Sequence, residues 1–187
     1  MKRKDFIFLL SFTFLIFMLG PLLPATPSHA KTAKQIDEEV NAAIKLFSQH
    51  VKGGKTFLNA AKGVLVIPNI VKAGLGVGGQ YGEGALRIGG KTVEYYSLVA
   101  GSVGFQIGAQ KVNLLLVFMD ESALHNFRMS SGWKVGVDGS VAFIDVGKGK
   151  SLDTVNIKDP IAAFMFAQRG LMANATIEGA KFTKLVR

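Results

Sequence analysis

Residues able to perform catalysis are few in this 187-residue chain, and they are scattered. The chain contains three histidines, His29, His50 and His125, and no cysteine. A hydrolytic metal site needs imidazole, carboxylate or thiolate ligands that meet at one point, and isolated histidines do not indicate one. Without cysteine the chain forms neither disulfides nor a thiolate nucleophile. We therefore expect no catalytic residue, no metal ion and no other cofactor.

One glycine motif matches a nucleotide-binding pattern by letter only. Gly74-x-Gly76-x-x-Gly79 has the spacing of the dinucleotide fingerprint, which works by opening a helix whose amides hold a pyrophosphate. Residues 80–84 instead alternate as a strand does. Neither a complete P-loop nor the Gly-x-Ser-x-Gly elbow of hydrolases occurs in the sequence. We expect no enzyme, although a hydrolase whose residues meet only in space stays an alternative.

Basic side chains are the residues best suited to binding. One grouping follows the first predicted helix and supplies our candidate lipid-contacting residues: Lys52, Lys55, Lys62 and Lys72. A second grouping closes the sequence: Lys181, Lys184 and Arg187. Each lysine held near an anionic leaflet contributes about 1 kcal/mol to adhesion, so several together would give salt-sensitive binding. The alternative is an ordinary solvated surface, because only the fold decides whether these lysines share one face.

The first 30 residues have the pattern of a secretory signal peptide. Residues 2–4 are basic, residues 6–19 are predominantly apolar, and Ser28-His29-Ala30 offers the small side chains of a cleavage site. An uncleaved anchor is the alternative, but a membrane span needs about 20 apolar residues, and prolines follow soon after residue 19. We predict cleavage after Ala30, which makes 1–30 the signal peptide and 31–187 a single domain.

The charge of the predicted exported part favours anionic partners. Residues 1–30 hold three basic residues and one acidic residue, so 19 Lys and Arg remain against 12 Asp and Glu, a formal charge of +7. A basic surface attracts anions. A chain routed to the periplasm or the cell exterior meets anionic lipid rather than nucleic acid, and we expect it to be peripheral on a membrane.

The elements that must position these lysines are one helix and a series of strands. Apolar residues recur at three- and four-residue steps in residues 32–51, which predicts an amphipathic helix. Its mixed acidic and basic face favours docking on the protein's own core over a membrane surface. Asp120 caps a short helix that ends near residue 128. Strands are predicted at residues 64–67, 73–88, 95–110, 112–119, 133–143, 161–167 and 171–177, with a loop at 146–159.

The expected fold class is α+β and β-dominated: a curved antiparallel sheet or barrel-like arrangement with an N-terminal amphipathic helix and one short internal helix. Glycines alternate with larger residues in the strands predicted at 73–88 and 95–110. Glycine inside a strand indicates a bend, a bulge or the close approach of another backbone. The lone Trp133 lies on the apolar face of its predicted strand and is expected in the core.

Five ordered segments of the chain resemble the SYLF domain family, in particular its bacterial branch. They are 61–68 (AKGVLVIP), 72–74 (KAG) with the glycines that continue to 84, 104–110 (GFQIGAQ), 131–140 (SGWKVGVDGS), and 168–173 (QRGLMA) leading to 178–179. The resemblance extends over roughly residues 35–187. It implies lipid binding, because eukaryotic SYLF modules associate with phosphoinositide-containing membranes and, in fungal endocytic adaptors, with actin. Actin binding is not expected here, since the chain lacks the Src-homology-3 partner domain of those adaptors and carries an export signal.

Together these observations predict a lipid-binding protein of the cell envelope that associates with anionic phospholipid or phosphoinositide-type membranes through basic and apolar surface. Within the segments that resemble the family, Lys62 and Lys72 are the first positions to test. Two alternatives stay open: a carrier that holds an apolar ligand inside the curved sheet, and a structural or interaction protein of the envelope.

Overall fold

A computed structural model describes residues 30–51, 53–104, 111–144, 159–167, 170–171, 177 and 179–187. Residues 31–187 form one compact unit. The predicted signal peptide up to residue 29, all but the last residue of the loop predicted at 146–159, and Lys52 lie outside the described residues. The elements are α2 (Ala33–His50), α3 (Gly54–Ala60), β1 (Gly63–Ile88), β2 (Lys91–Gly104), β3 (Lys111–Phe118), α4 (Glu121–Met129), β4 (Trp133–Lys134), β5 (Ala142–Phe143), β6 (Ile161–Ala167), β7 (Gly170–Leu171) and β8 (Lys181–Leu185).

Helix α2 forms where the amphipathic pattern predicts it. Thr32 and Gln35 make a capping box, in which the Thr32 side chain accepts from the Gln35 backbone and the Gln35 side chain accepts from the Thr32 backbone. Such a cap stabilises a helix by about 1 kcal/mol. The apolar face of α2 is buried through Ile36, Val40, Ala43 and Phe47. The helix therefore docks on the protein's own core, as its mixed polar face indicated.

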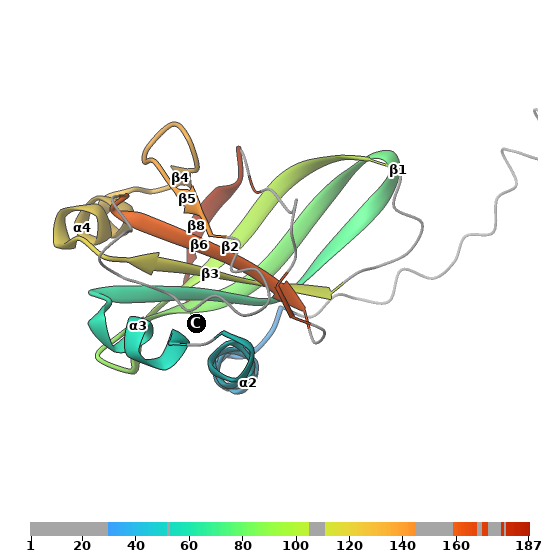
Figure 1. The fold of residues 1–187 in the computed structure, drawn as a ribbon. Coiled ribbons are helices and arrows are strands. Elements are labelled where there is room, and N and C mark those ends of the chain that lie inside the picture. The colour runs from blue at the N-terminus through green and yellow to red at the C-terminus, as the bar shows by residue number, and fades with distance from the viewer. Residues whose placement is uncertain are drawn as a thin grey trace, which may run out of the picture. The chain divides into compact units, whose positions relative to one another are not determined.

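The strands build one curled, open sheet that forms half of a barrel (Figure 1). The strand order is β4-β8-β2-β1-β3-β6-β5, and β7 pairs with β6 outside this path. Neighbouring strands are antiparallel except for the short parallel pair of β5 and β6. The predicted β-dominated α+β class with a curved sheet and an N-terminal helix is confirmed.

Strand β1 doubles back on itself. Its first part pairs with β3 and its second part pairs with β2. Val66 and Gly84 lie 18 positions apart, which in a straight strand would be about 60 Å. A Cβ atom on Gly84 would nevertheless lie 1.9 Å from the Val66 carbonyl oxygen. Figure 1 shows the return of this strand beside its label. The strand glycines thus permit the close approach of another backbone, as the sequence indicated.

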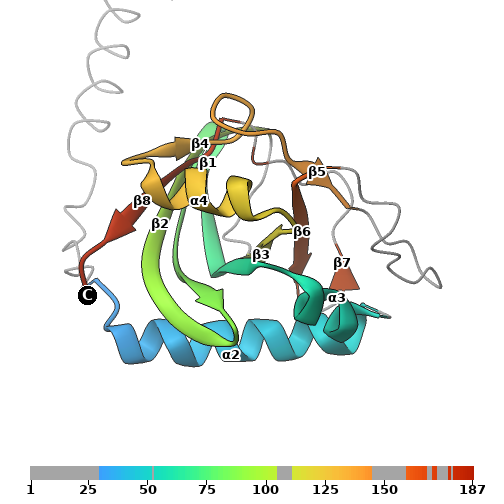
Figure 2. The same ribbon diagram turned by 90° about the vertical axis from the view of Figure 1, so that its left-hand side faces the viewer.

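Two apolar cores lie on opposite faces of the sheet. The first takes side chains from nearly every strand and from α4, and it surrounds Phe127 with Tyr96, Phe118, Trp133 and Phe182. The sheet contributes to this core from β4 to β6 and curls around it (Figure 2). The second core packs α2 and α3 against the opposite face. Trp133 is 2% exposed, which confirms its expected core position.

Several predicted elements are confirmed in the described residues. Strand β3 occupies the predicted segment 112–119 almost residue for residue. Helix α4 begins after Asp120, whose carboxylate accepts a hydrogen bond from the Ala123 backbone at 3.0 Å. Strands β6 and β7 form the predicted hairpin, of which residues 168–169 and 172–176 lie outside the described part. Within the described residues, none of the helices combines the length and apolar character required to span a membrane.

The prediction of a long strand at 133–143 is wrong, and two elements were not predicted. Only the two-residue pairs of β4 and β5 are strand there. Between them Gly136 has a φ of 79°, and the Asp138 carboxylate accepts from the Lys134 backbone at 2.7 Å. These features make a tight turn that leaves Val137 75% exposed. Helix α3 and strand β8 were not predicted.

Candidate functional site

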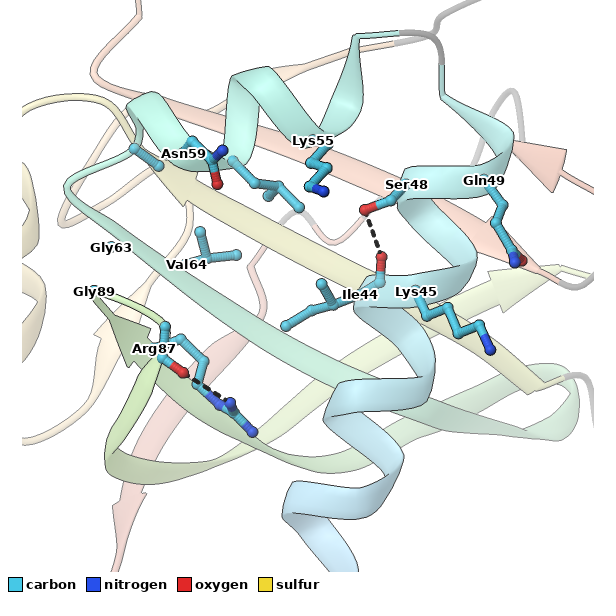
Figure 3. Close-up of a pocket in the computed structure, with 13 residues that line it drawn as sticks. Ile44, Lys45, Ser48, Gln49, Lys55, Asn59, Gly63, Val64, Arg87 and Gly89 are labelled. Carbon is cyan, nitrogen blue, oxygen red and sulfur yellow. Dashed lines mark hydrogen bonds between the residues drawn. The ribbon is translucent and has the colours of Figure 1, made fainter.

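A pocket of about 610 Å³ opens where α2, α3, the start of β1 and the β1–β2 turn meet (Figure 3). Such a volume falls within the range of about 300–1,000 Å³ typical of small-ligand sites. The lining residues are Ile44, Lys45, Ser48, Gln49, Lys55, Leu58, Asn59, Ala61, Gly63, Val64, Arg87, Gly89 and Gly90. The pocket is thus assembled from segments up to 46 positions apart in the sequence.

The interior of the pocket is apolar because each element contributes a side chain from the edge of its buried face. Ile44 lies one position after buried Ala43 on α2 and points toward Val64 and Arg87 (Figure 3). Leu58 lies one position after buried Phe57 on α3. Val64 is the second residue of β1 and is 7% exposed. Val64 belongs to the second core, whereas Ile44 and Leu58 pack against it and are only partly buried, so these two leave an apolar surface within reach of a ligand.

All charged residues that line the pocket are basic. Lys45 and Lys55 are exposed, Arg87 is half-buried, and the lining set contains no carboxylate. In Figure 3, Lys55 lies near Ser48, whose hydroxyl donates to the Ile44 carbonyl at 2.9 Å. Lys45 extends along the outer side of α2. The arrangement couples an apolar interior to a cationic rim, which suits an amphiphile with a negatively charged head.

Arg87 links the pocket wall to α2. Its guanidinium donates to the Gly90 carbonyl at 3.0 Å and to the Asn41 side chain at 3.0 Å. Asp37 lies 3.5 Å from the same guanidinium and also accepts from Thr92 at 2.6 Å. Among the described residues Nε of Arg87 has no hydrogen-bond partner although it is buried. A buried donor without a partner is costly.

The structure separates the lysines that the sequence grouped together. Lys55 lines the pocket. Lys62 lies between the pocket-lining residues Ala61 and Gly63, but its ammonium pairs with Glu121 of α4 at 3.6 Å. Lys72 lies on β1 eight positions beyond Val64, roughly 26 Å along the strand, and its side chain is not described. Lys52 falls outside the described residues. A lipid-contacting role for these four lysines stays a prediction.

The second basic grouping belongs to the folded sheet. Lys181 and Lys184 lie on β8, and the Lys184 ammonium pairs with Glu94 at 2.9 Å. Glu94 also accepts from Arg128 and from the hydroxyl of Tyr96. Burial alone would raise the pKa of Glu94, but the hydrogen bonds from Arg128, Lys184 and Tyr96 outweigh it and lower the pKa to about 2. This cluster joins α4, β2 and β8.

A metal site is not indicated by the described residues, since no three His, Asp or Glu side chains gather among them. The pocket residues that sequence reasoning missed are chiefly Ile44 and Arg87. Their side chains meet only because α2 crosses the β1–β2 turn, and they stand 43 positions apart. The one local signal was Ile44, which belonged to the apolar face of the predicted helix but lies at the edge of that face.

Comparison with known families gives one match. Residues 99–185 match the family Ysc84, described as Las17-binding protein actin regulator. The curated proteins that were searched contain no match to the chain. The matched segment runs from the second half of β2 to the end of β8. The pocket-lining residues precede it, so the family match bears on the fold and not on the pocket.

The match agrees with the resemblance noted from the sequence, because segments 104–110, 131–140 and 168–179 lie inside it. The family is known for adaptors that bind actin and lipid. An exported bacterial branch is not distinguished by the match. Residues 99–185 are thus similar to the Ysc84/SYLF domain family, which is consistent with a SYLF domain in this chain.

Proposed function

We propose that the protein is an exported, peripheral membrane protein that binds an anionic lipid in the pocket between α2, α3 and the β1–β2 turn. The acyl part contacts Ile44, Leu58 and Val64, and the anionic headgroup lies toward Lys55 and Arg87. The observation that carries the proposal is the composition of the pocket: its interior is apolar and its charged residues are all basic.

Electrostatics and volume both support an anionic amphiphile. Each lysine near an anionic leaflet contributes about 1 kcal/mol, and Lys45 and Lys55 are exposed at the pocket. A volume of about 610 Å³ is too small for a whole bilayer lipid with two extended chains but suits one chain or part of one. The headgroup can then stay at the membrane surface while the pocket takes an apolar end.

The inner face of the sheet is less suited to an enclosed ligand in its described part. The rings of Phe127, Trp133 and Phe182 fill it, with centroids 5.4 to 6.0 Å apart. The proposal therefore places the ligand on the helix-covered face. The proposed function involves neither catalysis nor a cofactor nor a nucleic-acid partner. The actin link in the family description is not extended to this chain, because its N-terminus has the pattern of an export signal.

Co-sedimentation of residues 31–187 with vesicles tests the membrane part of the proposal. We expect binding to anionic phosphatidylglycerol vesicles at low salt, weakening as salt rises because exposed charges are screened, and little binding to neutral vesicles. Lys55→Glu should weaken binding about tenfold. The matched control is Lys134→Glu, an exposed lysine on β4 away from the pocket. Equal losses in the two variants would contradict a pocket-centred mechanism.

A second experiment separates pocket binding from adhesion to a charged surface. The ligand is a short-chain phosphatidic acid kept below its micelle concentration and followed by calorimetry. Ser48→Trp places a large ring from α2 into the pocket and should abolish this binding. Ala42→Trp is the control, because Ala42 is exposed on the same helix and does not line the pocket. Retained binding in Ser48→Trp would overturn the proposed site.

A further inference from the structure

The first residue after the predicted cleavage site is held by two carboxylates. The backbone nitrogen of Lys31 lies 3.3 Å from Oε2 of Glu83 on β1. The side-chain ammonium of Lys31 lies 2.7 Å from Oε2 of Glu39 on α2. Ala30, which precedes it, is exposed. The chain thus passes from solvent to an anchored position within one residue, at the predicted cleavage point.

Glu83 is an unusual group to find at such a position. Its side chain is only 5% exposed. Oε1 accepts from the Tyr81 hydroxyl at 2.7 Å and from Arg187 at 3.0 Å, whereas among the described residues the donor to Oε2 is the Lys31 nitrogen. Burial alone would raise the pKa of Glu83, but the hydrogen bonds from Tyr81 and Arg187 lower it below its ordinary value. The buried carboxylate is therefore anionic, and its Oε2 can accept a further hydrogen bond.

We propose that Glu83 is the docking site for the new N-terminal ammonium that cleavage after Ala30 creates. Hydrolysis adds one water across the Ala30–Lys31 peptide bond and leaves a carboxylate on Ala30 and an ammonium on Lys31. A single neutral N–H donor then becomes a cation with three donors facing a nearly buried carboxylate. Charge-assisted hydrogen bonds are about twice as strong as neutral ones, so processing strengthens an existing contact. The proposal rests on the export proposed above but not on lipid binding.

The position of Lys31 beside the N-terminus of α2 explains why an ammonium there needs an anionic partner such as Glu83. Lys31 immediately precedes the helix N-cap Thr32, and the first turn of α2 contains no acidic residue. The partial positive charge at a helix N-terminus disfavours a nearby cation. A free ammonium at Lys31 is therefore unfavourable unless an anion faces it. Glu83 supplies that anion from the sheet, while Glu39 neutralises the side chain of the same residue.

The starting point of the exported protein is the first measurement. Intact mass and N-terminal sequencing of protein recovered after export should give Lys31 as residue one, and any other start would overturn the proposal. Three forms of residues 31–187 are then compared by thermal unfolding: the free amine, the Nα-acetylated chain, and the chain that retains Ala30. We expect the free-amine form to melt about 3 °C above the other two. Equal melting temperatures would overturn the proposal.

Two substitutions test whether the difference in melting temperature depends on Glu83. In Glu83→Gln the difference between free and acetylated forms should fall below about 1 °C, because the anion is gone. In Arg187→Met it should persist or grow, since Glu83 then keeps only the N-terminal cation, and this background also serves if Glu83→Gln fails to fold. Glu39→Gln is the matched control and should leave the difference unchanged. A difference that survives in Glu83→Gln, or disappears in Arg187→Met, would contradict docking on Glu83.

Discussion

At the scale of single residues, Glu94 shows how one carboxylate joins three elements. It contacts Arg128 of α4 at 3.1 Å and Lys184 of β8 at 2.9 Å, and it accepts from Tyr96 at 2.8 Å. Burial and the neighbouring Glu94 raise the pKa of the Tyr96 hydroxyl, so that it stays a donor. The glutamate is 16% exposed, whereas its two cationic partners are about 40% exposed. Solvent therefore screens part of this interaction.

We expect Glu94→Gln to lower the free energy of unfolding by about 2 kcal/mol at pH 7, after allowance for this screening. The pKa of Glu94 is lowered from 4.5 to about 2 in the folded protein. Its contribution is therefore present above pH 4.5 and is lost as the pH falls toward 2. Urea unfolding of both proteins across this range should show the two stabilities converging.

Glu38→Gln is the matched control for this experiment. Glu38 pairs with Lys34 at 3.9 Å, and both side chains are mostly exposed. Exposed pairs of this kind contribute about 0.5 kcal/mol or less. A loss in Glu38→Gln as large as that in Glu94→Gln, or a Glu94→Gln deficit that persists unchanged at pH 2, would mean that the buried cluster is not the source of the effect.

At the scale of elements, the doubled-back strand β1 decides the shape of the sheet. It pairs with β3 at one end and with β2 at the other, and register shifts occur between Ile67 and Ile70 and between Leu86 and Arg87. The contact between Gly84 and the Val66 backbone leaves no room for a side chain. This return also brings the β1–β2 turn beside the start of β1, where the pocket opens.

Gly84→Ala should therefore be severely destabilising, by about 3 kcal/mol or more, because the methyl group would meet backbone that cannot move cheaply. The matched control is Gly101→Ala on β2, where an added Cβ atom would have no neighbour within 4 Å. Thermal unfolding followed by circular dichroism compares the two. Similar melting temperatures for the two variants would show that β1 does not make this close return in solution.

The elements that were predictable are those with a strong local pattern. Helix α2 follows from its apolar spacing, α4 from its Asp120 cap, and β3 from its continuous apolar run. Helix α3 has only seven residues and begins at the second glycine of the Gly53–Gly54 pair, so its apolar pattern is too short to indicate a helix. The basic residues of β8 indicated a surface cluster, but this segment is a strand of the sheet and its Phe182 is buried.

The pocket was not predictable from local sequence, because it depends on how distant segments meet. Lys55 was a candidate for its charge and does line the pocket, whereas Lys62 was a candidate for the same reason and pairs with α4 instead. Nothing in the spacing of Ile44 and Arg87 indicates that they face each other. The turn after Lys134 was missed because Val135 and Val137 continue an alternating pattern that Gly136 interrupts.

At the scale of the whole molecule, one sheet separates two apolar cores. Phe47 of α2 packs on Phe164 at 5.0 Å in the second core, while Phe127 of α4 packs on Trp133 at 5.4 Å in the first. Neighbouring residues of β3 alternate between the cores, with Leu114 and Leu116 in the first and Leu115 and Val117 in the second. The cores share their strands and should unfold together.

Phe47→Ala tests this coupling, because Trp133 is the only tryptophan and reports on the opposite core. We expect a loss of about 3–5 kcal/mol, visible as an equal shift of the transition followed by Trp133 fluorescence and by circular dichroism. Phe143→Ala is the control, since Phe143 is 41% exposed. A fluorescence transition that stays in place would mean that the two faces unfold independently.

The pairing of β2 with β8 sets the order in which the protein can be completed during synthesis. Tyr95 pairs with Leu185, and β4 has β8 as its sheet neighbour. Until residue 185 has left the ribosome, β2 keeps an open edge and Trp133 lacks the strand that covers it. Contacts of such long sequence separation form late, because their loop-closure entropy must first be overcome. A nascent chain of this topology thus stays incompletely folded until β8 is made, a property that is compatible with the export that we propose.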